Sequence, residues 1–177
     1  RSAALYSPLG SIGDYVWKDL NNNGIQDDGN TGVNNVSVVL LKKNQANVFV
    51  PIDTTLTANN PVGGTLGWYS FTDLSAGEYQ VKILTGSLPA GCVLSDSTNK
   101  GGDDTKDSDA GTGGFTPKIT INANGTGIEK NNTTIDAGIK NTCVPPSVQV
   151  SANKSICVGE STSLIGTSAG NLIRWYY

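Results

Sequence analysis

Short apolar stretches recur along the first 140 residues of the chain, each bounded by glycine, asparagine, aspartate or proline. Within them, apolar and polar side chains alternate or β-branched residues follow one another, which is typical of β-strands. No long segment has the 3.6-residue period of an amphipathic helix. The pattern predicts seven strands, over residues 12–17, 36–42, 48–52, 68–71, 79–84, 115–121 and 133–139.

The stretch GEYQVKIL shows the alternation most clearly. Tyr79, Val81 and Ile83 would point to one face of a sheet and the residues between them to the other, so one face is buried and one is solvated. The stretch VSVVLLK is apolar almost throughout, which favours a central strand. The turn before GEYQVKIL places Gly77 where we expect a positive φ.

Seven short strands within about 130 residues predict a β-sandwich. The composition agrees with an all-β fold: the chain has 22 glycines and no methionine or histidine, and only 15% of its residues are charged. Asparagine, threonine and serine are common, which suits short strands joined by polar turns.

Charge and hydropathy argue against two classes of partner. The net charge is -3 and the lysines and arginines do not cluster, which argues against a nucleic-acid-binding surface. No run of apolar residues is long enough to cross a membrane, and the N-terminus lacks the apolar core of a signal peptide. We expect the chain to be a mature or excised part of a longer protein.

The segment NTCVPP marks a domain boundary, because two adjacent prolines cannot donate hydrogen bonds to a strand ladder. We divide the chain into an N-terminal arm (1–10), a β-sandwich (11–140), a proline linker (141–146) and a partial second domain (147–177). About thirty residues cannot bury a sandwich core alone. We expect this last part to be truncated or to be completed by a partner.

The stretch DLNNNGIQDDGN, residues 19–30, has the spacing of a calcium-binding loop. Oxygen-bearing side chains stand at its first, third, fifth and ninth positions, and Gly24 at the sixth allows a sharp turn. The candidate ligands are the side chains of Asp19, Asn21, Asn23, Asp27, Asp28 and Asn30 and the backbone carbonyl of Ile25. Because the flanking residues are strand-like, we predict an EF-hand-like loop on a β scaffold; the alternative is an Asn/Asp-rich turn.

One position departs from the calcium-loop pattern. The twelfth residue, where EF-hands place a bidentate glutamate, is Asn30. The change removes a charge and an oxygen, so we expect either weaker binding or a replacement ligand from Asp28 or a neighbouring loop.

A second acidic run, GGDDTKDSDAG, brings Asp103, Asp104, Asp107 and Asp109 within seven residues. Like charges about 4 Å apart cost roughly 1 kcal/mol even in water, so these carboxylates need either solvation or a bridging cation. The run therefore predicts a second calcium site, with a solvated loop as the alternative.

The three cysteines are Cys92, Cys143 and Cys157. Their spacing fits no zinc motif, and without histidine no fourth ligand is evident. We expect one structural disulfide and one remaining thiol. The pair is either Cys143 with Cys157 or Cys92 with Cys143.

The motifs GSIGDYVWKDLNNNGIQDDGN, GWYSFTDLSAGEYQVKI and GGDDTKDSDAGTG resemble the SdrD B-like domains, the B repeats of staphylococcal serine-aspartate-repeat adhesins. The resemblance runs from about residue 10 to 140 and implies a Cna B-type, prealbumin-like and immunoglobulin-like β-sandwich. It also implies a calcium-stiffened stalk module outside the bacterial cell, with neighbouring repeats as partners. In that family the second acidic loop folds toward the first and shares further calcium ions.

The C-terminal stretch ICVGESTSLIGTSAGNLIRWYY resembles the first half of immunoglobulin-like repeats in surface proteins of Bacteroidota. Cys157 would lie on the second strand of that repeat and Trp175 on the third.

Several other functions are alternatives to a stalk module. We do not expect an enzyme, because histidine is missing and the acidic residues cluster in turns with metal-ligand spacing, with no evident pair facing each other across a cleft. Relatives of the Cna B type form isopeptide crosslinks, for which Lys18, Asp136 and the acid Glu78 are candidates. The inserted stretch 55–67 is either a tolerated insertion or a loop that contacts a host or surface ligand. Finally, the arm and the incomplete second domain would allow subunits to form a filament by β-strand addition.

Overall fold

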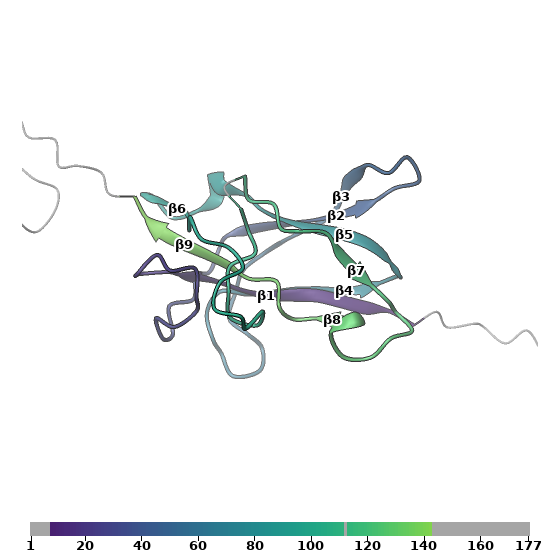
Figure 1. The fold of residues 1–177 in the computed structure, drawn as a ribbon, viewed down its shortest axis with the longest axis horizontal. Coiled ribbons are helices and arrows are strands. Elements are labelled where there is room, and N and C mark those ends of the chain that lie inside the picture. Colours follow the sequence, from purple (N-terminus) through teal and green to yellow (C-terminus); the bar gives the residue numbers. More distant parts are fainter. Residues whose placement is uncertain (1–7, 112, 143–177) are drawn as a thin grey trace, which may run out of the picture. The chain divides into compact units, whose positions relative to one another are not determined.

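The computed structural model describes residues 8–111 and 113–142 (Figure 1). The chain divides into two compact units, residues 1–142 and 143–177, and the described residues belong to the first. The predicted arm up to residue 7 and the predicted second domain lie outside the described residues. The last strand of the first unit continues to Asn141, and the backbone N–H of Thr142 still donates to the carbonyl of Gly91 (2.7 Å).

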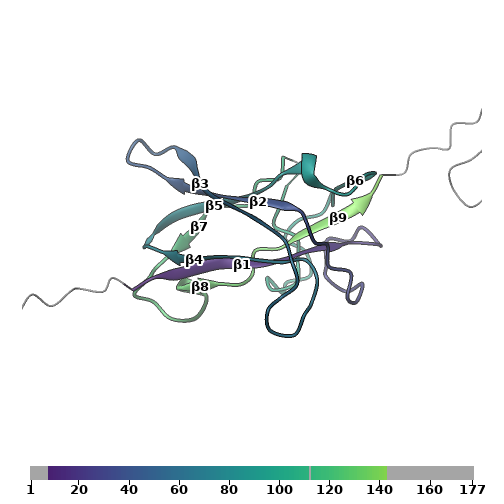
Figure 2. The same ribbon diagram turned by 180° about the vertical axis from the view of Figure 1, so that it is seen from behind.

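Two sheets form the sandwich that the sequence predicted, and Figures 1 and 2 show them as two layers. One sheet contains β4 (Trp68–Leu74), β1 (Gly10–Lys18), β9 (Ala137–Asn141) and β6 (Cys92–Leu94) in that order, with β8 (Asn131–Asn132) also paired to β1. The other contains β3 (Phe49–Leu56), β2 (Ser37–Lys43), β5 (Gly77–Ile83) and β7 (Ile119–Ile121).

Helical structure in the described residues is limited to two short 3₁₀ turns, η1 (Thr85–Ser87) and η2 (Gly127–Glu129). Neither turn has the length that a helix needs to cross a membrane.

The core lies between the two sheets and takes alternate side chains from each. In β5, Tyr79, Val81 and Ile83 are buried as predicted. The β2 strand is central, between β3 and β5, which also agrees with its apolar sequence. Other core side chains include Ile12, Val16, Val38, Leu40, Tyr69, Phe71, Ile121 and Ile139.

The predicted strand 115–121 is shorter in the structure. Only Ile119–Ile121 pair with β5, while Phe115 makes an isolated bridge to Lys82. Pro117 lies between these two contacts, and a proline has no N–H to donate to a ladder. The expected positive φ at Gly77 is also wrong, because Asp73 adopts it (58°) and Gly77 is the first residue of β5.

The predicted strand 133–139 begins late, at Ala137, because two backbone N–H groups before it bond to side chains. The N–H of Thr134 donates to Asn132 Oδ1 (3.0 Å), and that of Asp136 donates to Asp109 Oδ2 (2.8 Å). A group bonded in this way cannot join a strand ladder. The short strands β6 and β8 were not predicted.

The inserted stretch 55–67 is anchored at its base. The hydroxyl of Thr57 donates to the carbonyl of Val33 (2.6 Å), and the side chain of Asn60 donates to Tyr15 Oη (2.5 Å). Gly67 has a φ of +86°, and a Cβ placed there would lie 2.2 Å from the carbonyl oxygen of Val16. The glycine therefore lets the returning loop touch β1 directly.

Replacing Gly67 with alanine should destabilise the protein more than replacing Gly64 in the same loop. Both residues have positive φ, which costs an alanine roughly 1–2 kcal/mol, but a Cβ at Gly64 meets nothing within 4 Å. The clash with Val16 should add about 1–3 kcal/mol for Gly67→Ala. Urea denaturation of both variants measures the difference, and equal losses of unfolding free energy would refute the close-contact explanation.

Candidate metal centre

The first acidic loop, residues 19–30, leaves β1 directly and is fixed to the sheet at its first residue. Asp19 is only 1% exposed, and its backbone N–H donates to the carbonyl of Ile139 in β9 (2.8 Å). Its carboxylate accepts the backbone N–H groups of Asn23 (3.1 Å) and Gly24 (2.9 Å). Gly24 has a φ of 78°, so it supplies the predicted turn.

The other side chains of this loop turn toward one another. The two carboxylate oxygens of Asp27 accept from the amides of Asn21 (3.1 Å) and Asn23 (3.0 Å). The carboxylate of Asp28 accepts the N–H of Leu20 (2.9 Å) and so folds back over the start of the loop. Five of the predicted ligands are thus held around the loop by its own hydrogen bonds.

Two predicted ligands of the first loop differ from these five. The carbonyl of Ile25 accepts the N–H of Asp27 (2.9 Å), and Asn30 is exposed. At the last position of the loop, therefore, the structure presents a solvent-facing amide where calcium loops carry a bidentate carboxylate.

The second acidic loop lies against the first, near β6 and β9 (Figures 1 and 2). Ile25 and Asp107 form an antiparallel bridge, with the N–H of Gln26 donating to the carbonyl of Lys106 (2.6 Å). The N–H of Ser108 donates to the carbonyl of Gly24 (3.0 Å). Two segments that are about eighty residues apart in the chain therefore form one bridged structure.

Three of the four carboxylates predicted in the second loop lie together. Asp104, Asp107 and Asp109 each place an oxygen within 4.8 Å of the others. Asp107 is 4% exposed and its Oδ1 has no hydrogen-bond partner in the described residues. The fourth, Asp103, instead accepts from Thr105 Oγ1 (2.6 Å) and lies outside the cluster.

A polar cavity of about 230 Å³ adjoins this cluster. Asp104 and Asp109 line it, together with Asn99, Asn132 and Thr134. Lys118 also lines it, and its ammonium group pairs with Glu78. The hydroxyl of Thr134 donates to Asp104 Oδ2 (3.0 Å). The cavity therefore offers amide and hydroxyl oxygens beside the carboxylates, the hard ligands that calcium prefers.

Two further aspartates lie on the interior side of the cluster. Asp136 is 1% exposed; its Oδ1 accepts the N–H of Tyr15 (3.1 Å) and its Oδ2 has no partner. Asp14, in β1, is the neighbouring charge with the largest effect on Asp136. Asp14 is not among the ligands predicted from the sequence. Its position two residues from both Ile12 and Val16, on the core-facing side of an alternating strand, is the signal that was available.

The environment raises the pKa of these carboxyl groups. Burial, the largest cause, raises the pKa of Asp14 and Asp109 to about 7 and that of Asp136 to about 9, and it also raises the pKa of Asp107. Neighbouring carboxylates contribute further in Asp107, Asp109 and Asp136. None of these four aspartates forms an ion pair with another described residue.

The three isopeptide candidates come from different parts of the two sheets. Glu78 lies on β5 in the other sheet and forms ion pairs with Lys118 (2.5 Å) and Lys43 (2.7 Å), whose hydrogen bonds lower its pKa to about 2. Lys18 ends β1 and is paired with Ile139. Described ion pairs include neither Lys18 nor Asp136.

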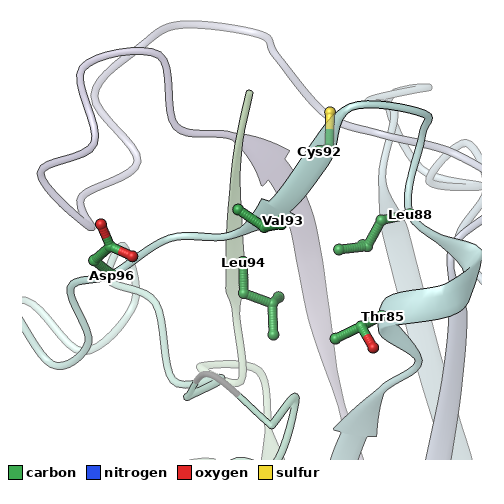
Figure 3. A pocket seen from close by; sticks show the side chains of 6 residues that line it. All are labelled: Thr85, Leu88, Cys92, Val93, Leu94 and Asp96. Atoms are coloured by element: carbon green, nitrogen blue, oxygen red, sulfur yellow. The ribbon is translucent and has the colours of Figure 1, made fainter. Parts of the chain in front are cut away.

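Cys92 is half-buried, and its Sγ donates to Asn141 Oδ1 (3.3 Å). Cys143 and Cys157 lie outside the described residues, so the disulfide pairing stays a prediction. Beside Cys92 is a hollow of about 310 Å³, and Figure 3 shows Leu88, Leu94 and Thr85 around it with the Cys92 sulfur directed away. This apolar hollow is separate from the acidic cluster.

Comparison with known proteins matches residues 10–139 to the family model of the SdrD B-like domain. The serine-aspartate repeat-containing protein F of Staphylococcus epidermidis (strain ATCC 12228 / FDA PCI 1200) is 38% identical over 132 residues, which are 75% of this chain and 7% of that protein. The serine-aspartate repeat-containing protein D of Staphylococcus aureus (strain Newman) is 36% identical over 138 residues, 78% of this chain and 9% of that protein. The chain thus spans under a tenth of these relatives.

Without metal, the stability of the folded protein should fall as the pH rises from about 5 to about 9. The folded-state pKa values of Asp109 and Asp136 lie above the ordinary value of 3.8, so the folded chain binds more protons than the unfolded chain in this window. The resulting stabilisation is lost as the pH passes about 7 and then about 9. Denaturant titrations of metal-stripped protein measure the trend; stability that stays constant or rises across this window would contradict it.

Proposed function

Because the chain belongs to the SdrD B-like domain family, we propose that it is a non-catalytic structural module of a bacterial cell-surface adhesin, stiffened by calcium and acting as a stalk or spacer. The module would work outside the cell, with neighbouring repeats of the same protein as partners. The family match and the two relatives named for their serine-aspartate repeats support a repetitive surface protein.

The observation that carries the calcium proposal is the buried, unpartnered Oδ1 of Asp107 within a cluster of three carboxylates. A buried charged oxygen without a partner is costly, and a cation would compensate it. Calcium takes six to eight oxygen ligands, and the donors here are carboxylate, amide and hydroxyl oxygens. Asp104, Asp107 and Asp109 would hold the ion, and Asn132 and Thr134 line the adjoining cavity.

The first loop would hold a separate ion through Asp19, Asn21, Asn23 and Asp27, with the Ile25 carbonyl as a further donor. Asn30 provides no carboxylate at the twelfth position. The carboxylate of Asp28 folds back to the N–H of Leu20, at the start of the loop, which supports it as the replacement. Bound calcium would neutralise the carboxylates, and the loop would supply the coordinating oxygens.

Calcium would add to the folding free energy, because the unfolded chain does not hold these oxygens together. It would also restrict the two loops, which are joined by a few backbone hydrogen bonds between residues 24–26 and 106–108. The module would then behave as a rigid rod segment when calcium is bound and as a looser one when it is removed.

The path of the chain through the sandwich supports a stalk. β1 starts at one end of the sandwich and β9 finishes at the other, and the two strands are parallel neighbours (Figure 1). A pull on the two ends of the module would shear these strands along their length. The first loop directly follows β1, and Asp136 directly precedes β9, so ions in this region would reinforce the loaded pair.

Calorimetric titration with calcium should give a saturable heat, and saturation should raise the melting temperature. At calcium a hundredfold above Kd, one site adds about 2.7 kcal/mol, equivalent to roughly 5–10 °C for a chain of this size. The double variant Asp19→Asn, Asp107→Asn should lose most of both effects. Asp53→Asn, which changes an exposed carboxylate on β3, is the matched control. No heat and no shift in the unmodified chain would overturn the calcium proposal.

Calcium should also slow hydrogen exchange in the two acidic loops. We expect amides in 19–30 and 96–109 to exchange faster in chelator, whereas those of β2 and β5 should change little because both strands pair on each side. Mass spectrometry of exchanged peptides separates these segments. A uniform change over the whole sandwich would indicate global stabilisation without local stiffening.

A further inference from the structure

The strand β3 forms the outer edge of its sheet and pairs with β2 alone among the described strands (Figures 1 and 2). With eight residues it is longer than the other edge strands, β4, β6 and β7. Its middle residues are exposed, and the side chains of Ile52 and Leu56 are 49% and 54% exposed. A long, exposed edge with apolar side chains is a place where a strand of another molecule can add to the sheet.

The two ends of the β2–β3 pair show which backbone groups of β3 face away from β2. At the hairpin end, the N–H of Asn44 donates to the carbonyl of Val48 (2.9 Å). At the other end, the N–H of Thr57 donates to the carbonyl of Val36 (2.9 Å). Backbone groups alternate in direction along a strand, and β3 contains one extra residue without a partner in β2, Ile52. The residues whose backbone groups face outward are therefore Phe49, Pro51, Thr54 and Leu56.

The two central residues of this outward-facing set offer no free N–H. Pro51 has no backbone N–H, and because it faces outward the ladder with β2 loses nothing. The N–H of Thr54 donates to Oδ1 of the Asp53 carboxylate (2.7 Å). Asp53 also places a charge on the strand, so two such strands would bring like charges close together. Outward-facing donors therefore remain only near the ends of β3, at Phe49 and Leu56.

The extra residue in β3 also works against the addition of a strand. The register shifts at Ile52, since Leu40 pairs with Asp53 and Leu41 pairs with Pro51. An extra residue of this kind bends the strand and increases its twist. Natural edge strands use such bulges, together with proline and charged residues, to prevent pairing with other molecules.

We propose that Pro51 and Asp53 close the edge of β3 against the β3 strand of a second copy of this chain. The closure does not involve calcium, because β3 contributes no residue to either acidic loop. It matters for the proposed stalk, in which neighbouring repeats would hold similar edges at a high local concentration. Open edges could pair side by side and join modules that a stalk must keep separate.

The test is the self-association of the full 177-residue chain, measured by sedimentation velocity over a range of concentrations. The double variant Pro51→Thr, Asp53→Val gains one outward N–H and releases that of Thr54. Its self-association should be at least about tenfold tighter than that of the unmodified chain, because several intermolecular backbone hydrogen bonds become available. Hydrogen exchange in residues 48–57 should slow as the variant associates.

The matched control makes the same two exchanges outside the strands. Pro61 lies in the inserted stretch and Glu129 lies on the turn η2, and both are exposed. The double variant Pro61→Thr, Glu129→Val therefore changes composition and charge as the test variant does, but it leaves the edge of β3 intact. It should associate no more tightly than the unmodified chain.

The proposal would be overturned by a test variant that associates as weakly as the unmodified chain. Association that the control equals, or that leaves exchange in residues 48–57 unchanged, would overturn it too. Circular dichroism verifies folding, and should the double variant not fold, Pro51→Thr and Asp53→Val alone should each tighten self-association. The result should be the same in calcium and in chelator, so a chain that binds no calcium would overturn the proposed function and leave this inference standing.

Discussion

Several carboxylates are buried at one end of the sandwich, and no cationic side chain of the described residues forms an ion pair with them. The backbone at that end is arranged to satisfy these buried groups. Such groups need donors, and peptide N–H groups supply them. Asp19 takes two from its own loop, and Asp136 takes one from Tyr15. Each N–H used in this way is lost to the strand ladder, which explains why irregular backbone gathers here.

The short strand β9 connects these loops to the sheet. Its carbonyls accept the N–H groups of Asp19 (2.8 Å) and Ser95 (2.9 Å), and the N–H of Gly138 donates to Ser108 Oγ (3.1 Å). A Cβ at Gly138 would lie 2.8 Å from Ser95 Oγ and 3.2 Å from the ring of Trp17. Only glycine allows both loops to approach this strand so closely, and a change in either loop therefore reaches the sheet through β9.

The sequence predicted the regular strands and the local loop well, but it predicted poorly which side chains come together in the folded chain. Alternation identified β5 because one face of that strand is buried, and ligand spacing identified the first loop because its contacts are local. Spacing could not show which of the four nearby aspartates would cluster. Asp103 lies outside the cluster because its carboxylate accepts hydrogen bonds from the hydroxyl and the N–H of Thr105. Asp14 was missed because one polar residue in an alternating strand looks ordinary until its pairing across the sheet with the core residue Tyr69 is known.

If the module is loaded through β1 and β9, as proposed, it would need reinforcement where these strands meet the loops. The structure favours an ionic reinforcement over a covalent one. An isopeptide bond would need Lys18, Asp136 and Glu78 together, yet Glu78 is held on the other sheet by two lysines. The carboxylates, by contrast, gather just after β1 and just before β9, the positions where sheared strands would begin to separate. Cations bound there would resist that separation reversibly, and removing them would leave repulsive charges at the same points.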